Sequence, residues 1–140
     1  MCEIYKNTLY ILICFNLVIN SQAQGLAETL LQVKPSIVGV GTFLPSRSPR
    51  GIFLGTGFVI GNGQLIVTNA HVVNKKINTG RLEQWAIFIS HNNSPRMAVV
   101  DKVAVDVEHD IAILKLKQGR LPTLALGNGS RVKEGGLYAF

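Results

Sequence analysis

Two apolar, mostly β-branched runs with a four-residue turn between them constrain the fold of this chain more than any other feature. Residues 55–60 and 65–73 flank the sequence Gly-Asn-Gly-Gln at positions 61–64. Asn-Gly between two such runs is the strongest short signal for a tight β-hairpin. The second run reaches His71 just where the strand-like pattern gives way to polar sequence. The hairpin therefore predicts a histidine at the end of a strand, held by a sheet and facing a cleft.

The remaining sequence continues this pattern of short strands and turn-rich loops. Further strand-like runs occupy residues 36–43, 85–89, 97–107 and 111–116, with loops predicted at 45–51, 74–84 and 92–95. Residues 26–33 have helical spacing, and Pro35 ends that segment. About six strands with little helix predict an all-β fold, a small antiparallel six-stranded β-barrel preceded by a short N-terminal helix.

Three blocks of this sequence carry a resemblance to a known family. They read Gly-Thr-Gly-Phe-Val-Ile at 55–60, Val-Thr-Asn-Ala-His-Val-Val at 67–73 and Asp-Ile-Ala-Ile-Leu-Lys-Leu at 110–116. In order and spacing they resemble the trypsin-like serine peptidases of the HtrA (high-temperature-requirement) type, over roughly residues 27–140. The resemblance implies a two-barrel fold of which this chain represents the first barrel. It also implies a peptide or unfolded-protein substrate, no cofactor, and a homo-oligomer, which is a trimer in the family.

The same resemblance assigns roles to two residues. It makes His71 the general base and Asp110 the acid that orients it, with Ala70 as the small neighbour that lets the carboxylate approach. In such a site a neutral imidazole takes the proton of a serine hydroxyl, and a carboxylate fixes the imidazole tautomer and stabilises the imidazolium. The separation of 39 positions suits a pair brought together by strand pairing.

Other acidic residues near Asp110 are weaker candidates for the orienting role. Asp106 and Glu108 lie close to it in sequence, but only Asp110 directly precedes the Ile-Ala-Ile-Leu run where the family places its aspartate. We therefore expect Asp110 to be the partner of the histidine.

A metal site is the alternative use of the histidines. His71, His91 and His109 are suitable zinc ligands by type, but no close paired spacing supports such a site. We expect His91 and His109 to be surface residues and predict no metal.

The serine nucleophile is not found in these 140 residues. The only serine after Asp110 is Ser130, which lacks the Gly-Asn/Asp-Ser-Gly-Gly surroundings that form an oxyanion hole. We expect the chain to end at the crossing into the second barrel, to expose an apolar inter-barrel face, and not to cleave peptides by itself. The alternative is a non-catalytic pseudo-peptidase module that binds a peptide or protein.

The first 23 residues resemble a secretory signal peptide. Lys6 precedes an apolar segment, and Ser21-Gln22-Ala23 offers small residues for cleavage before Gln24. This leaves residues 24–140 as the peptidase domain, exported to a periplasm or secreted, with no stable membrane anchor after cleavage. Both cysteines, Cys2 and Cys14, would be removed, so the mature chain would have neither a disulfide nor a thiolate nucleophile.

The net charge of +6 does not indicate a nucleic-acid partner. The basic residues are scattered, the longest run is Lys75-Lys76, and no aromatic stripe lies between them. A solvated basic surface explains this charge.

Overall fold

The computed structural model describes residues 27–91 and 94–131. Residues 27–33 are helical, as expected, and belong for the most part to a unit separate from the one that contains the barrel, which spans Val33–Val132. The predicted signal peptide lies outside the described residues. Within the described part of the chain, no helix has the length and apolar character needed to cross a membrane.

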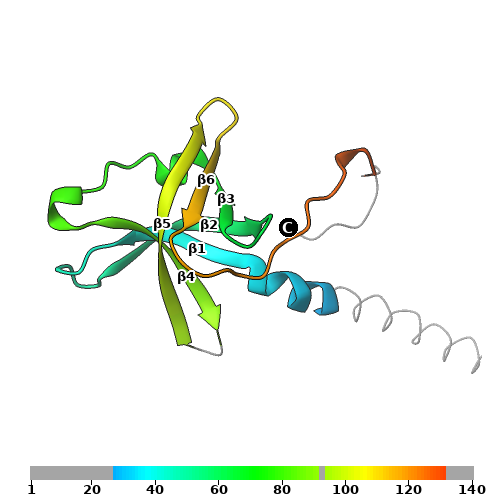
Figure 1. Cartoon of the computed structure of the whole chain (residues 1–140), viewed down its shortest axis with the longest axis horizontal. Coiled ribbons are helices and arrows are strands. Elements are labelled where there is room, and N and C mark those ends of the chain that lie inside the picture. Colours follow the sequence, from blue (N-terminus) through cyan, green and yellow to red (C-terminus); the bar gives the residue numbers. More distant parts are fainter. Residues whose placement is uncertain (1–26, 92–93, 132–140) are drawn as a thin grey trace, which may run out of the picture. The chain divides into compact units, whose positions relative to one another are not determined.

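Six antiparallel strands close into a barrel in the order β1-β2-β3-β6-β5-β4 (Figure 1). Each strand pairs antiparallel with both of its neighbours. The strands are β1 (Ile37–Phe43), β2 (Gly51–Ile60), β3 (Leu65–Thr68), β4 (Gln84–His91), β5 (Ser94–Asp106) and β6 (Ile111–Leu116). The prediction of a six-stranded antiparallel barrel with a short helix before it is confirmed.

Alternating side chains of the strands fill the barrel. Most of the largest fully buried side chains are branched aliphatic residues, which suit a pleated, enclosed surface. The core comprises Val38, Val40, Val59, Ile66, Val72, Val73, Trp85, Ile87, Val100, Ala112, Leu114 and Leu116. Two of its members, Val72 and Val73, come from the segment that also carries the candidate histidine, so the core fixes that segment directly.

The local structure around the histidine differs from the prediction in one respect. His71 does not end a strand, because β3 stops at Thr68 and a 3₁₀ helix, η2 (Ala70–Val73), follows it. The pattern of Val72 and Val73 looks strand-like, but both side chains turn into the core from a tight helical turn. Periodicity alone does not separate these two conformations over four residues.

The segment 74–84 is mostly exposed, as its polar composition predicts, but one residue near its end is buried. It contains a short 3₁₀ helix, η3 (Thr79–Arg81), and the buried residue is Glu83, whose exposed fraction is only 6%. Arg47 pairs with Glu83 at 3.0 Å, and the backbone N–H of Asn78 donates to it at 2.8 Å. The Asn78 hydrogen bond lowers the pKa of Glu83, burial opposes this, and the Thr42 and Arg47 side chains lower it further. The loop after the histidine is thus tied to the loop between β1 and β2.

A bulge separates the first three residues of β2, 51–53, from the Gly-Thr-Gly-Phe-Val-Ile block at 55–60. The β1–β2 register shifts between Val40, which faces Gly55, and Gly41, which faces Phe53, so Leu54 has no partner in β1. A Cβ atom on Gly41 would lie 1.9 Å from the carbonyl oxygen of Ile52, so only glycine fits. The bulge bends β2 just before it passes beneath η2.

Candidate active site

His71 lies in η2, directly after β3. Asn69 is the N-cap of this helix and has extended backbone angles, so the chain turns sharply between the end of β3 and the histidine. The side chain of Thr68 anchors the turn by donating a hydrogen bond to the carbonyl oxygen of Thr56 at 2.8 Å. The sheet therefore sets the position from which the imidazole projects into solvent.

Asp110 lies at the end of the β5–β6 turn, directly before β6, which is the neighbour of β3 in the barrel. Its φ angle is +53°, in the left-handed region that aspartate tolerates better than most residues. Its N–H donates to the carbonyl oxygen of Val107 at 3.4 Å, which closes the turn. β6 then pairs with β3, matching Ala112 with Thr68, and this pairing brings the aspartate next to η2.

The two residues meet through both carboxylate oxygens of Asp110. Oδ2 lies 2.7 Å from Nδ1 of His71, and Oδ1 accepts a hydrogen bond from the backbone N–H of His71 at 2.9 Å. The side-chain amide of Asn69 donates to Oδ2 at 3.1 Å and to the backbone carbonyl oxygen of Asp110 at 3.2 Å. These bonds fix the plane of the carboxylate and the orientation of the ring.

The electrostatics of the pair favour an ionised aspartate. The hydrogen bond from the backbone N–H of His71, followed by the contact with its ring, holds the pKa of Asp110 below its ordinary value. Desolvation opposes this shift, and the Asn69 amide adds to it. A carboxylate on Nδ1 selects the tautomer with a proton on Nδ1 and a free lone pair on Nε2. The arrangement is therefore suited to accepting a proton at Nε2.

Gly55 lets η2 approach the sheet closely. A Cβ atom at Gly55 would lie 2.6 Å from Cγ2 of Val72, the residue after the histidine, so a side chain there would push the helix away. A glycine within a strand can serve a close backbone approach or a bulge. Gly55 serves both, because it flanks the unpaired Leu54 and lies beneath Val72.

Lys102 holds the other end of η2. Its ammonium group donates to the carbonyl oxygen of Val73 at 3.3 Å and lies 5.9 Å from the ring centroid of Trp85, within reach of a cation–π interaction. A cation at the carboxyl end of a helical turn satisfies a carbonyl group that the turn leaves without a partner.

Comparison with known proteins now identifies the family of this barrel. A family model described as "Trypsin-like peptidase domain" matches residues 55–140. The chain belongs to this family. It is 32% identical over 114 residues to serine protease HTRA4 of Homo sapiens, covering 79% of this chain and 22% of that protein. It is also 39% identical over 82 residues to "Probable periplasmic serine endoprotease DegP-like" of Halomonas elongata, covering 59% of this chain and 15% of that protein.

A solved structure shares the fold of this peptidase domain. The crystal structure of Deg5 superposes with a TM-score of 0.60 at 22% sequence identity, covering 80% of this chain and 52% of that chain. The chain spans about a quarter or less of the length of the curated relatives reported above. The predicted resemblance to trypsin-like peptidases of the HtrA type is thus confirmed at the level of family and fold.

The peptidase domain also contains a second histidine–aspartate contact. Nδ1 of His109 lies 2.8 Å from Oδ2 of Asp106, and the backbone N–H of His109 donates to Oδ1 at 3.1 Å. The hydrogen bond from that N–H and the one from the ring lower the pKa of Asp106. His109 is exposed, as expected from the sequence.

Sequence reasoning missed two residues of the site, Asn69 and Lys102. Asn69 stands inside the Val-Thr-Asn-Ala-His block, so its place in the motif was the available signal. Lys102 had no local signal, because its contacts with Val73 and Trp85 depend on the barrel closing. Among the side chains that the structure describes, no three His, Cys, Asp or Glu residues form a group suited to hold a metal ion.

Proposed function

We propose that this chain supplies the general base and its orienting acid to a serine-type endopeptidase. The observation that carries the proposal is the 2.7 Å contact between His71 and Asp110, two residues 39 positions apart. Membership of the trypsin-like peptidase domain family supports it. In this reading Nε2 of His71 takes the proton of an attacking serine hydroxyl and later gives it to the leaving amine. Asp110 remains ionised and stabilises the imidazolium formed between these two steps.

The nucleophile and the oxyanion hole belong, in this proposal, to residues other than those of the barrel. Ser130 is a poor nucleophile, because its hydroxyl donates at 2.8 Å to the amide oxygen Oδ1 of Asn128, which is too weak a base to take its proton. We therefore propose that the 140-residue chain alone does not hydrolyse peptides. A fluorophosphonate probe that labels the purified chain at Ser130 would contradict this.

The decisive experiment uses the gene product that carries a serine in a Gly-Asn-Ser-Gly-Gly context, sought by sequencing the transcript beyond the Phe140 codon. Peptide hydrolysis by that product should be lost when His71 is replaced by alanine, and the serine should no longer react with the fluorophosphonate. Unchanged hydrolysis by the His71→Ala variant would refute the proposal.

The remaining features of the proposal follow the relatives. The substrate is a peptide or an unfolded protein, in line with the serine protease relatives, and homo-oligomerisation as a trimer remains part of the proposal. Export to a periplasm or secretion after removal of residues 1–23 agrees with one relative named periplasmic. Mass spectrometry of the exported protein would test this, since the proposal requires an N-terminus at Gln24.

A further inference from the structure

One stretch of β5 is paired on a single side only. β4 pairs with β5 from Ser94 to Val99, whereas β6 joins β5 only from Val100 onward. Within the described residues no strand covers the other side of β5 between residues 94 and 99. An uncovered strand edge offers backbone N–H and C=O groups to another chain.

The hydrogen-bond pattern shows which groups face this open side. The N–H of Lys117 donates to the carbonyl oxygen of Val99 at 3.3 Å, so the polar groups of Val99 point away from β4. Because backbone polar groups alternate along an antiparallel strand, those of Met97 point to the same side. Pro95, which has no N–H, occupies the next position on this side, as expected for an edge.

A cavity of about 330 Å³ lies between this edge and residues 118–122. That volume is at the lower end of the range for ligand pockets, ~300–1,000 Å³. The far wall is held to the β2–β3 hairpin, since Leu121 donates to Gly63 at 2.9 Å and Leu124 to Val59 at 2.7 Å. The segment 118–122 is therefore anchored away from β5 instead of pairing with it.

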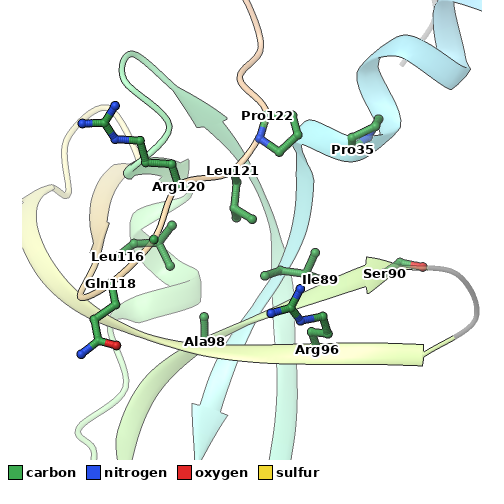
Figure 2. Close-up of a pocket in the computed structure, with 11 residues that line it drawn as sticks. Pro35, Ile89, Ser90, Arg96, Ala98, Leu116, Gln118, Arg120, Leu121 and Pro122 are labelled. Atoms are coloured by element: carbon green, nitrogen blue, oxygen red, sulfur yellow. The ribbon is translucent and has the colours of Figure 1, made fainter.

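The side chains of the cavity are apolar with a positive charge at one end. Ile89, Ala98, Leu116 and Leu121 form the apolar part, and the guanidinium of Arg96 points toward it from β5, whereas that of Arg120 turns away (Figure 2). Neither arginine has an ion pair or side-chain hydrogen bond among the described residues. No Asp or Glu lines the cavity, so its charge is unbalanced.

We propose that the edge of β5 at Met97 binds an extended peptide as an added strand. The peptide residue opposite Met97 would exchange backbone hydrogen bonds with it. The two neighbours of that residue would then face Ala98 and Arg96 on the cavity side. The site therefore selects a segment in which an aliphatic side chain and a carboxylate stand two residues apart.

This site is separate from the histidine and aspartate described above. β6 runs from Ile111, next to Asp110, to Leu116 in the wall of the cavity, six residues or about 20 Å at ~3.3 Å per residue. The proposal therefore goes beyond peptidase chemistry and does not depend on it.

Fluorescence anisotropy with a labelled peptide tests the proposal on the full 140-residue chain. The sequence Thr-Glu-Thr-Val-Thr-Glu-Thr reads the same in both directions, so it presents the required spacing to a parallel or an antiparallel edge. We expect saturable binding, and binding about tenfold weaker when lysine replaces both glutamates. Lack of saturation, or equal binding of both peptides, would overturn the proposal.

The Met97→Pro variant removes the edge N–H and should weaken binding about tenfold, whereas Met97→Ala, which keeps the N–H, should bind within about twofold of the wild type. N-methylation of the two threonines that flank the valine removes backbone N–H donors from the peptide and gives the same test without altering the protein. Equal binding of the methylated peptide would refute strand addition.

Arginine variants test the predicted charge preference. Arg96→Glu should reverse the preference in favour of the lysine peptide, and the surface variant Arg81→Gln is the control that keeps it. If the Arg96→Glu variant still preferred the glutamate peptide, Arg96 would not be the partner of the peptide carboxylate. The His71→Ala variant should bind as the wild type does, so a failure of this proposal is distinguishable from a failure of the proposed peptidase function.

Discussion

Two histidine–aspartate pairs lie at the same end of the barrel with nearly the same local geometry. In each pair the aspartate accepts the backbone N–H of the histidine and contacts Nδ1 of its ring. The ring contacts measure 2.7 Å for His71–Asp110 and 2.8 Å for His109–Asp106. Both pairs are solvent-exposed. A short contact between an imidazole and a carboxylate therefore does not by itself mark a catalytic pair.

What differs is how each pair is held together. His109 and Asp106 are three residues apart, so the β5–β6 turn alone brings them into contact. His71 follows β3 and Asp110 precedes β6, so the pairing of these two strands brings them together. The side-chain amide of Asn69 also donates a hydrogen bond to the aspartate. The long-range pair exists only in the folded barrel, and three features maintain it, namely Gly55, Lys102 and Asn69. Four experiments distinguish the long-range pair from the local one.

The largest expected difference concerns peptide hydrolysis by a gene product that contains the serine. His71→Ala should lower kcat/KM by about 10⁴- to 10⁶-fold, because it removes the proton acceptor of a serine peptidase. His109→Ala, which removes the matching ring from the local pair, should stay within about threefold of the wild type. A comparable loss in both variants would show that the two pairs are not functionally distinct.

The second difference concerns the support beneath η2. Gly55→Ala should lower the free energy of unfolding by about 1–3 kcal/mol, because the new methyl group overlaps the stiff side chain of Val72. The displacement should also weaken the His71–Asp110 contact. Urea denaturation gives the first effect. Proton NMR gives the second, since a ring N–H in a short bond to a carboxylate resonates far downfield.

Controls for this prediction lie within the same chain. A Cβ at Gly127 would meet no atom within 4 Å, so Gly127→Ala should change stability by less than about 0.5 kcal/mol. The downfield signal of His109 should persist in Gly55→Ala, because its partner is local. Adding Val72→Ala should restore part of the His71 signal. Loss of both histidine signals would indicate general unfolding and contradict the positioning role of Gly55.

Much of the fold could be predicted because its signals are local. The Asn62-Gly63 turn, the β-branched runs and the intervening loops were enough to predict about six strands, and the barrel has six. The prediction was wrong in detail where tertiary packing decides conformation. Val72 and Val73 have a strand-like pattern but lie in a 3₁₀ helix. Glu83 belongs to a polar segment but is buried, with contacts to Arg47 and Asn78.

The candidate site was only partly predictable. His71 and Asp110 were selected by their motifs, and their roles remain predictions that activity must test. The His109–Asp106 pair was missed, although a spacing of three residues across a turn is a local signal. Lys102 could not be predicted, because no pattern in β5 indicates that it reaches the last carbonyl group of η2. Contacts made by barrel closure leave little trace in sequence.

The third difference concerns the contacts of Lys102 with the end of η2. Lys102→Met keeps the aliphatic stem but removes the donor to Val73 and the cation over Trp85, so it should destabilise the barrel by about 0.5–1.5 kcal/mol. Lys76→Met alters an exposed lysine and should be neutral. Exchange of the His71 ring proton with solvent should accelerate in Lys102→Met, whereas that of His109 should not. Equally accelerated ring-proton exchange at both histidines would contradict a specific role of Lys102 in holding η2.

The smallest effect is the response of the two pairs to acid. Hydrogen bonds from the histidines lower the pKa of both Asp110 and Asp106 in the folded chain. The stabilisation from each carboxylate is therefore fully present above the unfolded-state pKa of about 3.9 and is lost as the pH falls through the lower folded-state value. Both ring contacts should accordingly persist below pH ~4 in ¹H–¹⁵N spectra of the histidine rings.

Single asparagine variants separate the two pairs in this experiment. Asp110→Asn should abolish the acid-dependent step in the His71 signals and leave that of His109 intact, and Asp106→Asn should do the reverse. Because the local pair forms within one turn, its contact should survive partial unfolding in urea at pH 7, whereas the contact between His71 and Asp110 should disappear with the barrel. If both contacts vanished together, the turn would owe its geometry to the barrel, and the distinction between a local and a fold-dependent pair would fail.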